Sequence, residues 1–224
     1  MVIILILVFL VPLLLFIASL NISWNFYVRA FSKSSYSSDG VMLTFDDGPH
    51  PQNTEKVLDI LAQSGVKAVF FLIGERAVEH PEIVKRIVRE GHLAGIHSMR
   101  HTAGFTIAPS RMVASDLEAC RKILEDITGT KINLFRPPFG VTNFNIARAV
   151  KKLSLKTVGW NVRSYDTAIK DPQRVIERVA GRITPGSVIL LHDRMPDSPV
   201  ILTGILEAVR KKGLKTTIFR ELNG

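Results

Sequence analysis

From residue 41 onward the sequence alternates short apolar runs with longer segments of helical periodicity, and this alternation restricts the possible folds more than any other feature. We predict seven strands, over residues 41–45, 66–73, 93–97, 134–137, 156–162, 187–192 and 215–219. Six helices are predicted between them, over residues 53–63, 81–90, 110–128, 142–153, 172–183 and 200–212. Strands that alternate with helices form parallel sheets. The predicted fold class is therefore α/β, with a parallel sheet that is either closed into a barrel or open.

Residues 1–20 form a separate apolar stretch in which Ser19 is the only polar side chain. No charged residue precedes Arg29, and about 20 apolar residues are enough for a helix to cross a bilayer. The stretch lacks the basic start of a secretory signal and has no clear cleavage site behind it. We therefore predict an N-terminal transmembrane helix over residues 1–20, with a cleaved signal peptide as the alternative.

The segment between this stretch and the first predicted strand is rich in serine, with SKSSYSSDG at residues 32–40. Serine-rich chains behave as flexible spacers rather than as folded elements. We predict a linker over residues 21–40, followed by a single domain over residues 41–224.

The charge balance is basic, because 29 Lys and Arg residues against 20 Asp and Glu residues leave a net charge of +9. Such a balance suits an anionic partner, whether nucleic acid, a membrane surface or an acidic wall polymer. No basic cluster interleaved with aromatic residues and no known motif supports nucleic-acid binding, so we predict no nucleic-acid partner. The only cysteine, Cys120, cannot form an internal disulfide.

Polar side chains that are unusual in apolar strands stand at or just beyond the ends of several predicted strands. These residues are Asp46, Asp47, His97, Arg136, Asp166 and His192. Because the carboxyl ends of parallel strands gather on one face, where ligands bind, we predict that these side chains meet in one site. Two adjacent carboxylates repel each other when both are ionised, so a metal, an arginine or both should lie beside Asp46 and Asp47. A plain Asp-Asp-Gly-Pro turn is the alternative explanation.

His97 and His101 are four residues apart, a spacing that brings two imidazoles to the same side of a helical turn. Together with one aspartate they provide two histidines and one carboxylate, which leaves coordination positions open for water and substrate. Open positions are typical of catalytic metal sites. We predict a divalent metal, with zinc as the default and cobalt, nickel, manganese or iron as alternatives; two unrelated surface histidines are the other explanation.

Five segments resemble, in chain order, the five motifs of the polysaccharide deacetylases, carbohydrate esterase family 4. They are TFDDGPH at 44–50, HSMRH at 97–101, RPPFG at 136–140, the segment 160–166 and ILLHD at 189–193. The resemblance covers residues 41 to 219, and it implies a deformed (β/α) barrel of about seven parallel strands, similar to a TIM barrel. It also implies a metal-dependent hydrolase that removes acetyl groups from the N-acetylated sugars of a polymer.

By this resemblance, the metal ligands are expected to be Asp47, His97 and His101. Asp46 is the expected general base, and Arg136 is expected to orient it. His192 is the expected general acid, with Asp166 as its partner. We expect Arg136 to favour the ionised form of Asp46, and Asp166 to favour the protonated form of His192. Asp46 would then accept a proton and His192 would donate one.

The resemblance also implies substrate contacts from Phe139, Leu190 and Trp160. The backbone N–H near Phe139 would hold the oxyanion, and Leu190 would line the pocket for the acetyl methyl group. Three residues depart from the family pattern: Phe139 stands where tyrosine is usual, Thr167 where tryptophan often follows, and Arg163 where an acidic residue is common. Thr167 therefore bears on the shape of the groove, and Arg163 on the charge or register of the substrate.

We therefore predict removal of N-acetyl groups from a polysaccharide such as peptidoglycan or a chitin-like glycan. An esterase of O-acetylated polysaccharide such as xylan is the alternative, and a non-catalytic glycan-binding module is a weaker one. Because such glycans lie outside the cytoplasm, we expect a single-pass cell-membrane protein with an extracytoplasmic catalytic domain, secreted if the N-terminal segment is cleaved. Arg29 and Lys33 favour the opposite orientation. The predicted partners are the polysaccharide and, through the N-terminal helix, the membrane; no obligate protein partner is inferred.

Overall fold

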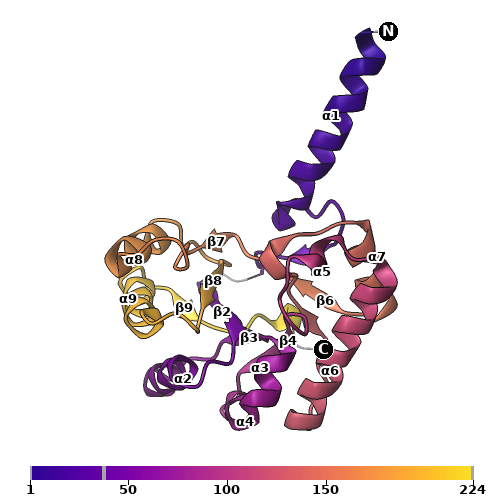
Figure 1. Ribbon diagram of the computed structural model, residues 1–224. Helices are drawn as coiled ribbons and strands as arrows, with labels where there is room; N and C mark the ends of the chain where they lie inside the picture. Colours follow the sequence, from indigo (N-terminus) through magenta and orange to yellow (C-terminus); the bar gives the residue numbers. More distant parts are fainter. Residues whose placement is uncertain (1, 37–38, 223–224) are drawn as a thin grey trace.

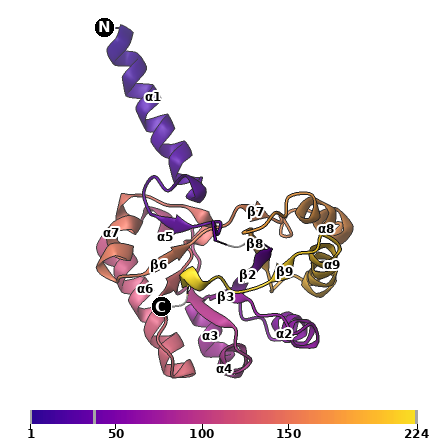
Figure 2. The same cartoon turned by 180° about the vertical axis from the view of Figure 1, so that it is seen from behind.

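The computed structural model describes residues 2–36 and 39–222, and for residues 2–8 it describes the backbone alone. Its centre is a sheet that curls into a half-barrel with helices around the outside (Figures 1 and 2). Strands follow one another in the order β1-β6-β5-β4-β3-β2-β8-β7, and β9 pairs with β2 outside this path. Every pairing between these named strands is parallel. The predicted α/β fold with a deformed barrel is confirmed.

The strands are short and their bounds differ from the predicted ones by a few residues. They are β1 (Ala30–Phe31), β2 (Gly40–Gly48), β3 (Val69–Leu72), β4 (Leu93–Ile96), β5 (Leu134–Phe135), β6 (Lys156–Val158), β7 (Val162–Arg163), β8 (Val188–His192) and β9 (Lys215–Thr216). The helices are α1 (Val2–Ser19), α2 (Asn53–Gln63), α3 (Gly74–Glu79), α4 (Pro81–Arg89), α5 (Gly104–Ile107), α6 (Ser110–Thr128), α7 (Phe144–Lys152), α8 (Pro172–Ala180) and α9 (Ser198–Lys211). The six helices predicted after residue 41 are confirmed as α2, α4, α6, α7, α8 and α9, and α3 and α5 are additional.

The strand predicted over residues 156–162 is wrong, because the chain forms two strands there. β6 pairs with β1 and β5, whereas β7 pairs with β8 at the other end of the sheet. The residues between them cross the open side of the half-barrel. Gly159 N–H donates to the Phe31 carbonyl (2.9 Å), and Asn161 N–H donates to the Val188 carbonyl (3.2 Å). This connection therefore joins the two ends of the sheet in place of a direct strand pair.

The alternation of side chains along β2 explains how the sheet supplies both a core and a site. Leu43 and Phe45 belong to the large core between the sheet and the helices, whereas Met42 packs in a second cluster on the other face. Because successive side chains of a strand point to opposite faces, Thr44 and Asp46 continue the row that Met42 begins. The inward row of β2 is thus apolar at its start and polar at its carboxyl end.

The linker predicted over residues 21–40 is wrong for its first part. β1 pairs with β6, with Ala30 opposite Thr157 and Phe31 opposite Val158. Ile22, at the start of a 3₁₀ turn that spans Ile22–Trp24, is also buried. Val28 and Ala30 are buried as well, whereas Trp24 and Phe26 are exposed, and within the serine-rich part Ser34 is buried. The serine-rich part includes residues 37–38, which lie outside the described residues.

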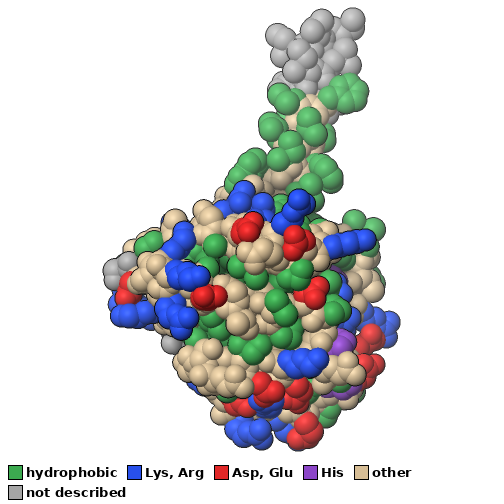
Figure 3. All heavy atoms as spheres, turned by 90° about the vertical axis from the view of Figure 1, so that its left-hand side faces the viewer, with side chains coloured by type: hydrophobic (Ala, Val, Ile, Leu, Met, Phe, Trp, Pro, Cys, Tyr) green, Lys and Arg blue, Asp and Glu red, His purple; other side chains and the backbone are tan. Residues whose placement is uncertain are grey.

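The helix α1 projects from the domain, and its described side chains are apolar apart from Ser19 (Figures 1 and 3). The Ser19 carbonyl accepts the Thr142 N–H (2.9 Å), and the Leu15 carbonyl accepts the Tyr27 hydroxyl (3.0 Å), so the base of α1 is tied to the domain. In the part of the chain that the structure describes, no helix has both the length and the hydropathy that a membrane span needs. The transmembrane helix predicted for residues 1–20 is therefore not supported.

Candidate active site

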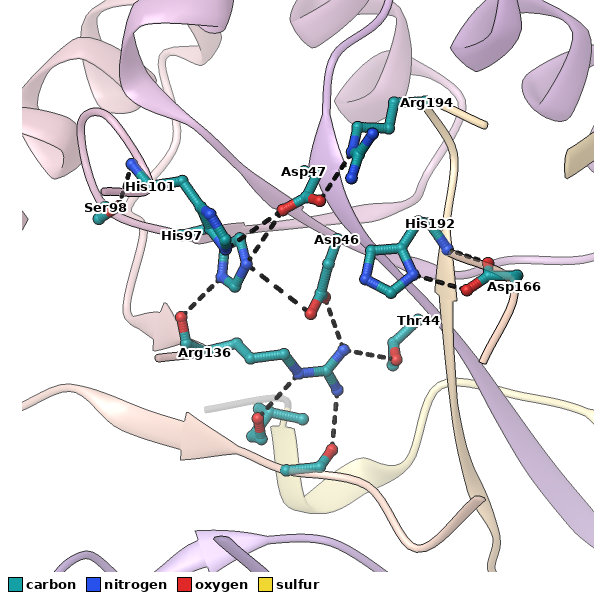
Figure 4. Close-up of polar contacts among 12 residues, drawn as sticks. Thr44, Asp46, Asp47, His97, Ser98, His101, Arg136, Asp166, His192 and Arg194 are labelled. Carbon is teal, nitrogen blue, oxygen red and sulfur yellow. Dashed lines mark hydrogen bonds and ion pairs between the residues drawn. The ribbon is translucent and has the colours of Figure 1, made fainter. Parts of the chain in front are cut away.

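Two consecutive aspartates at the end of β2 face the same place, which a regular strand does not allow because its side chains alternate. The register of β2 against β3 shifts between Asp46 and Gly48, and Asp47 has a φ of 71°, in the left-handed region. This irregularity turns the carboxylate of Asp47 towards the side of the strand that Asp46 occupies (Figure 4). Both side chains are buried. The sequence therefore places two acidic groups side by side in a site of low dielectric constant.

Arg136 is completely buried inside the half-barrel and compensates the charge of Asp46. Its guanidinium donates to Asp46 Oδ1 (2.7 Å) and to Thr44 Oγ1 (2.8 Å). It also donates to the carbonyls of Val158 (3.0 Å) and Gly159 (2.7 Å). Burial lowers the pKa of Arg136, and the ion pair with Asp46 opposes this effect. The prediction that Arg136 lies beside Asp46 is confirmed, and the second oxygen of Asp46 stays outside this ion pair.

Three side chains converge as the ligands of one metal ion would. Asp47 Oδ1 lies 3.4 Å from Nε2 of His97 and 3.4 Å from Nε2 of His101. Ligand atoms of the three residues all lie within 4.8 Å of one another. A tetrahedral zinc with bonds of about 2.0–2.1 Å holds its ligands about 3.3–3.4 Å apart, so the two distances from Asp47 fit. Asp47 Oδ1 is also buried without a hydrogen-bond partner among the described residues, which fits an atom that coordinates a cation.

The two histidines are held by a loop after β4 rather than by the helical turn that their spacing predicted. His97 Nδ1–H donates to the Arg136 carbonyl (2.8 Å), which leaves Nε2 for a metal. The backbone N–H of His101 donates to Ser98 Oγ (2.9 Å), and both residues have positive φ, 52° for His101 and 68° for Ser98. Burial and the nearby His97 lower the pKa of His101. His101 is therefore held as the neutral imidazole, which is the form that binds metals.

His192 and Asp166 form a second acid–base pair across the cavity from His97 (Figure 4). His192 ends β8 in register with Asp46 on β2. Its Nδ1–H donates to Asp166 Oδ1 (2.7 Å), and its backbone N–H donates to Asp166 Oδ2 (2.7 Å). Ser164 Oγ donates to Asp166 Oδ1 (2.9 Å) and steadies that carboxylate. Burial opposes protonation of His192, but the hydrogen bond to Asp166 and the negative charges of Asp166, Asp46 and Asp47 together outweigh it and raise the pKa of His192.

A cavity of about 210 Å³ opens among these groups. Its wall includes the three metal-ligating side chains, Asp46 and His192, together with all three predicted substrate contacts: Phe139, Trp160 and Leu190. Leu190 is nearly buried in the wall, whereas the Phe139 side chain is 51% exposed. Arg136 and Asp166 lie behind the wall, each hydrogen-bonded to a group within it. The structure thus brings together every residue that the sequence placed in the site.

Arg194 belongs to the site, although the sequence did not predict it. Its Nε–H donates to Asp47 Oδ2 (2.8 Å), and its backbone carbonyl accepts Nδ2–H of Asn53 (2.9 Å), which fixes the turn after β8. Burial would raise the pKa of Asp47, but the nearby His97 imidazole and the hydrogen bond from Arg194 hold it well below its usual range. The only sequence signal was the position of Arg194 directly after ILLHD, and no spacing rule assigns a role to that position.

Asp193 is a second residue to which the sequence assigned no role. It is fully buried, and Thr54 Oγ1 donates to its Oδ2 at 2.7 Å. A Cβ at Gly48 would overlap this carboxylate, so only glycine fits there. Burial raises the pKa of Asp193 to about 7. Asp193 therefore braces the end of β2 and the start of α2 from behind the metal-ligating residues.

A parallel half-barrel with two histidines, two carboxylates and a third histidine at the carboxyl ends of its strands has the construction of a metal-dependent hydrolase. Residues 33–158 match the family model for polysaccharide deacetylases. A chitooligosaccharide deacetylase of Sinorhizobium fredii is 33% identical over 170 residues, which are 76% of this chain and 79% of the relative. A peptidoglycan-N-acetylglucosamine deacetylase of Bacillus cereus is 34% identical over 193 residues, which are 84% of this chain and 70% of the relative.

A solved structure gives the same result. The Bc1960 peptidoglycan N-acetylglucosamine deacetylase superposes with a TM-score of 0.80 at 32% identity, covering 86% of this chain and 91% of that one. The chain therefore belongs to the polysaccharide deacetylase family, carbohydrate esterase family 4, and it is a hydrolase. The family resemblance noted in the five motifs is confirmed, and the fold agrees with it.

Proposed function

We propose that the protein hydrolyses the N-acetyl groups of amino sugars in a polysaccharide, either peptidoglycan or a chitin-like glycan. The observation that carries this proposal is the convergence of Asp47, His97 and His101, with Asp46 and His192 in the wall of the same cavity. The names of the two relatives, one a chitooligosaccharide deacetylase and one a peptidoglycan deacetylase, support an N-acetylated glycan as the substrate. The products are acetate and a sugar with a free amine.

Asp47, His97 and His101 would hold a divalent metal, with zinc the default for two imidazoles and one carboxylate. Such a metal polarises a carbonyl oxygen and makes water more acidic. The protein contributes rigidity to this set. Arg194 fixes one oxygen of Asp47, and the Arg136 carbonyl fixes the ring of His97, so these two residues keep their free ligand atoms close together.

Asp46 acts as the general base in this proposal. Arg136 occupies Oδ1, which leaves Oδ2 as the oxygen that can accept a proton, 3.8 Å from Nε2 of His97. The guanidinium compensates the negative charge that Asp46 carries as a base. Asp46 accepts a proton from the water that attacks the amide carbonyl. Backbone N–H near Phe139 faces the charge that develops on the carbonyl oxygen; one such donor is worth about 3–4 kcal/mol in acyl transfer.

His192 acts as the general acid when the carbon–nitrogen bond breaks. The leaving amine needs a proton, and the hydrogen bond from Nδ1 to Asp166 leaves Nε2 of His192 to supply it. Because Asp166 raises the pKa of His192, the imidazolium form persists to higher pH than it would without this partner. Leu190 lies in the same wall and offers an apolar surface to the acetyl methyl group.

Acetate release from three substrates tests the proposal. Chitin oligomers, peptidoglycan and acetylated xylan should be compared, each with and without added zinc or cobalt, and Asp46→Asn serves as the inactive control. We expect release from the N-acetylated substrates, dependent on metal and lost in the control. Release from acetylated xylan alone would favour an O-acetyl esterase. Binding of these glycans by the wild-type protein with no release from any would favour a glycan-binding module.

We also propose that the catalytic domain works outside the cytoplasm. The support is the substrate class, because wall and extracellular glycans lie there; Arg29 and Lys33 weigh against this orientation. Protease treatment of intact cells tests the proposal, with a cytoplasmic protein as the control. Degradation of the domain in intact cells is the expected result, and full protection until the cells are lysed would refute it.

A further inference from the structure

The charged groups around the cavity are matched almost one for one. Three pairs neutralise its carboxylates: Asp46–Arg136 at 2.7 Å, Asp47–Arg194 at 2.8 Å and Asp166–His192 at 2.7 Å. The summed charge of these three pairs is close to zero before any metal is bound. Each of these three carboxylates therefore already has a cationic partner, and an additional cation in the cavity wall would have no carboxylate among them to pair with.

Arg163 is such a further cation. It lines the same cavity as Asp46 and His192, and its side chain is exposed. No carboxylate of the described residues lies within ion-pair distance of it. A cation in the wall of a cavity without a counter-charge raises the local positive potential, and it attracts anionic ligands more strongly than an exposed arginine in an ion pair does.

Aromatic rings hold the Arg163 side chain in place. Its Cζ lies 4.8 Å from the centre of the Tyr165 ring and 5.9 Å from the centre of the Trp160 ring, which also lines the cavity. Arg178 on α8 also stacks on Tyr165, at 4.3 Å, and donates to the Arg163 carbonyl at 3.2 Å. Stacking uses the face of a guanidinium and leaves its N–H edge for an acceptor. The second arginine adds positive charge on the same side of the cavity.

We propose that Arg163 binds a carboxylate on the glycan, so that the preferred substrate is an acidic amino-sugar polysaccharide rather than uniform neutral chitin. This inference rests on the proposed function and specifies its substrate class. A guanidinium and a carboxylate match through two parallel hydrogen bonds, which supply both affinity and orientation. The carboxylate could belong to the lactyl ether of a muramic acid or to a uronic acid, and the chemistry recognised by Arg163 is the same.

The test uses the zinc-loaded full chain and three oligomers of equal length. In the first oligomer N-acetylglucosamine alternates with N-acetylmuramic acid, in the second it alternates with glucuronic acid, and the third contains N-acetylglucosamine alone. We expect kcat/KM to be about tenfold higher on one or both acidic oligomers, as one charge-assisted hydrogen bond can supply. The preference between the two acidic oligomers identifies the source of the carboxylate.

Arg163→Gln should remove this preference through KM, with kcat little changed and the activity on the neutral oligomer retained. Arg163→Lys keeps the charge but not the two-pronged geometry, and should retain part of the preference. Arg174→Gln is the matched control, because Arg174 is an exposed arginine on α8 that lies 3.8 Å from Asp171 and does not line the cavity. Added salt should weaken the preference in the wild type and leave Arg163→Gln unaffected.

The outcomes separate the two proposals. Acetate release at equal rates from neutral and acidic oligomers would refute the role of Arg163 and leave the proposed function standing. An equal loss on all three oligomers in Arg163→Gln would show that the residue supports the fold of the cavity, and would also refute the inference. No release from any oligomer by the wild-type, zinc-loaded protein would refute the proposed function, and the substrate preference with it.

Discussion

The ion pair between Arg136 and Asp46 makes a quantitative prediction about stability. Arg136 is fully buried and Asp46 is 4% exposed, so replacing the arginine leaves a carboxylate that water hardly reaches. Removing one partner of a buried pair costs about 3–5 kcal/mol, because the remaining charge stays desolvated. Two carbonyl groups, of Val158 and Gly159, lose their donor as well. Arg136→Met, which keeps an unbranched apolar stem but removes the guanidinium, should therefore lower the free energy of unfolding by about 3–5 kcal/mol.

A double-mutant cycle isolates the charge of Asp46 from the other contacts of Arg136. In the Asp46→Asn background the carboxylate is absent, and the cost of Arg136→Met should shrink by about 2 kcal/mol, within the range seen for residues in direct contact. Urea unfolding of the four proteins in the presence of a chelator gives these free energies without a contribution from bound metal. Arg174→Met is the control, since an exposed ion pair contributes about 1 kcal/mol or less.

Two results would contradict this reasoning. A cost for Arg136→Met as small as that of the Arg174 control would mean that water or a rearranged side chain solvates Asp46. A cost that is the same in both backgrounds would mean that Arg136 stabilises the half-barrel through Val158 and Gly159 alone, so that its link to Asp46 is unimportant for stability. Unequal slopes against urea would show a change in the denatured state rather than in the pair.

Three further predictions concern the metal and the acid. Asp166→Asn removes the group that raises the pKa of His192, so the alkaline fall of kcat should move to lower pH; an unchanged profile would argue against His192 as the acid. Zinc at about 100 times its Kd should stabilise the fold by about 2.7 kcal/mol in thermal melts, an effect that His101→Ala should abolish. Arg194→Gln removes a cation beside Asp47, so zinc affinity measured against a competing chelator should rise severalfold. Weaker binding would show that the positioning of Asp47 by Arg194 outweighs the repulsion between Arg194 and the metal.

The alternation of strands and helices was sufficient to predict that the polar residues at the strand ends meet in one site. Alternation along an apolar run says which residues share a face, and the run ends where Asp46 begins the polar part of that face. The parallel sheet then brings the ends of neighbouring strands together: Asp46 lies opposite His192 across β2 and β8, and Ile96, next to His97, lies opposite Phe135, next to Arg136. The position of polar residues at strand ends therefore predicted where the site lies, and the family resemblance supplied the expected roles.

Contacts between distant segments could not be predicted in this way. The break between β6 and β7 depends on Gly159, where a Cβ would overlap Ser32 Oγ, and on the amide of Asn161, which bonds the backbone of Val188. Neither partner is near in sequence, and the run from 156 to 162 looks like one strand. The pairing of Arg194 with Asp47 is hidden for the same reason, because it joins residues 147 positions apart.

Several motif residues in the site have strained backbone conformations, which the motif sequence alone does not produce. Asp47, Ser98, His101 and Phe139 all have φ between 52° and 71°, a region that residues other than glycine avoid at a cost of roughly 1–3 kcal/mol each. Such conformations persist only where surrounding contacts impose them. Here those contacts are the shifted register after Asp46, the Ser98 hydroxyl on the His101 amide, and the packing of the His101 ring against Phe139 at 4.4 Å. In a chain with the same motif residues but without these contacts, the loops would relax and the metal ligands would move apart. The strained backbone is therefore part of the metal site.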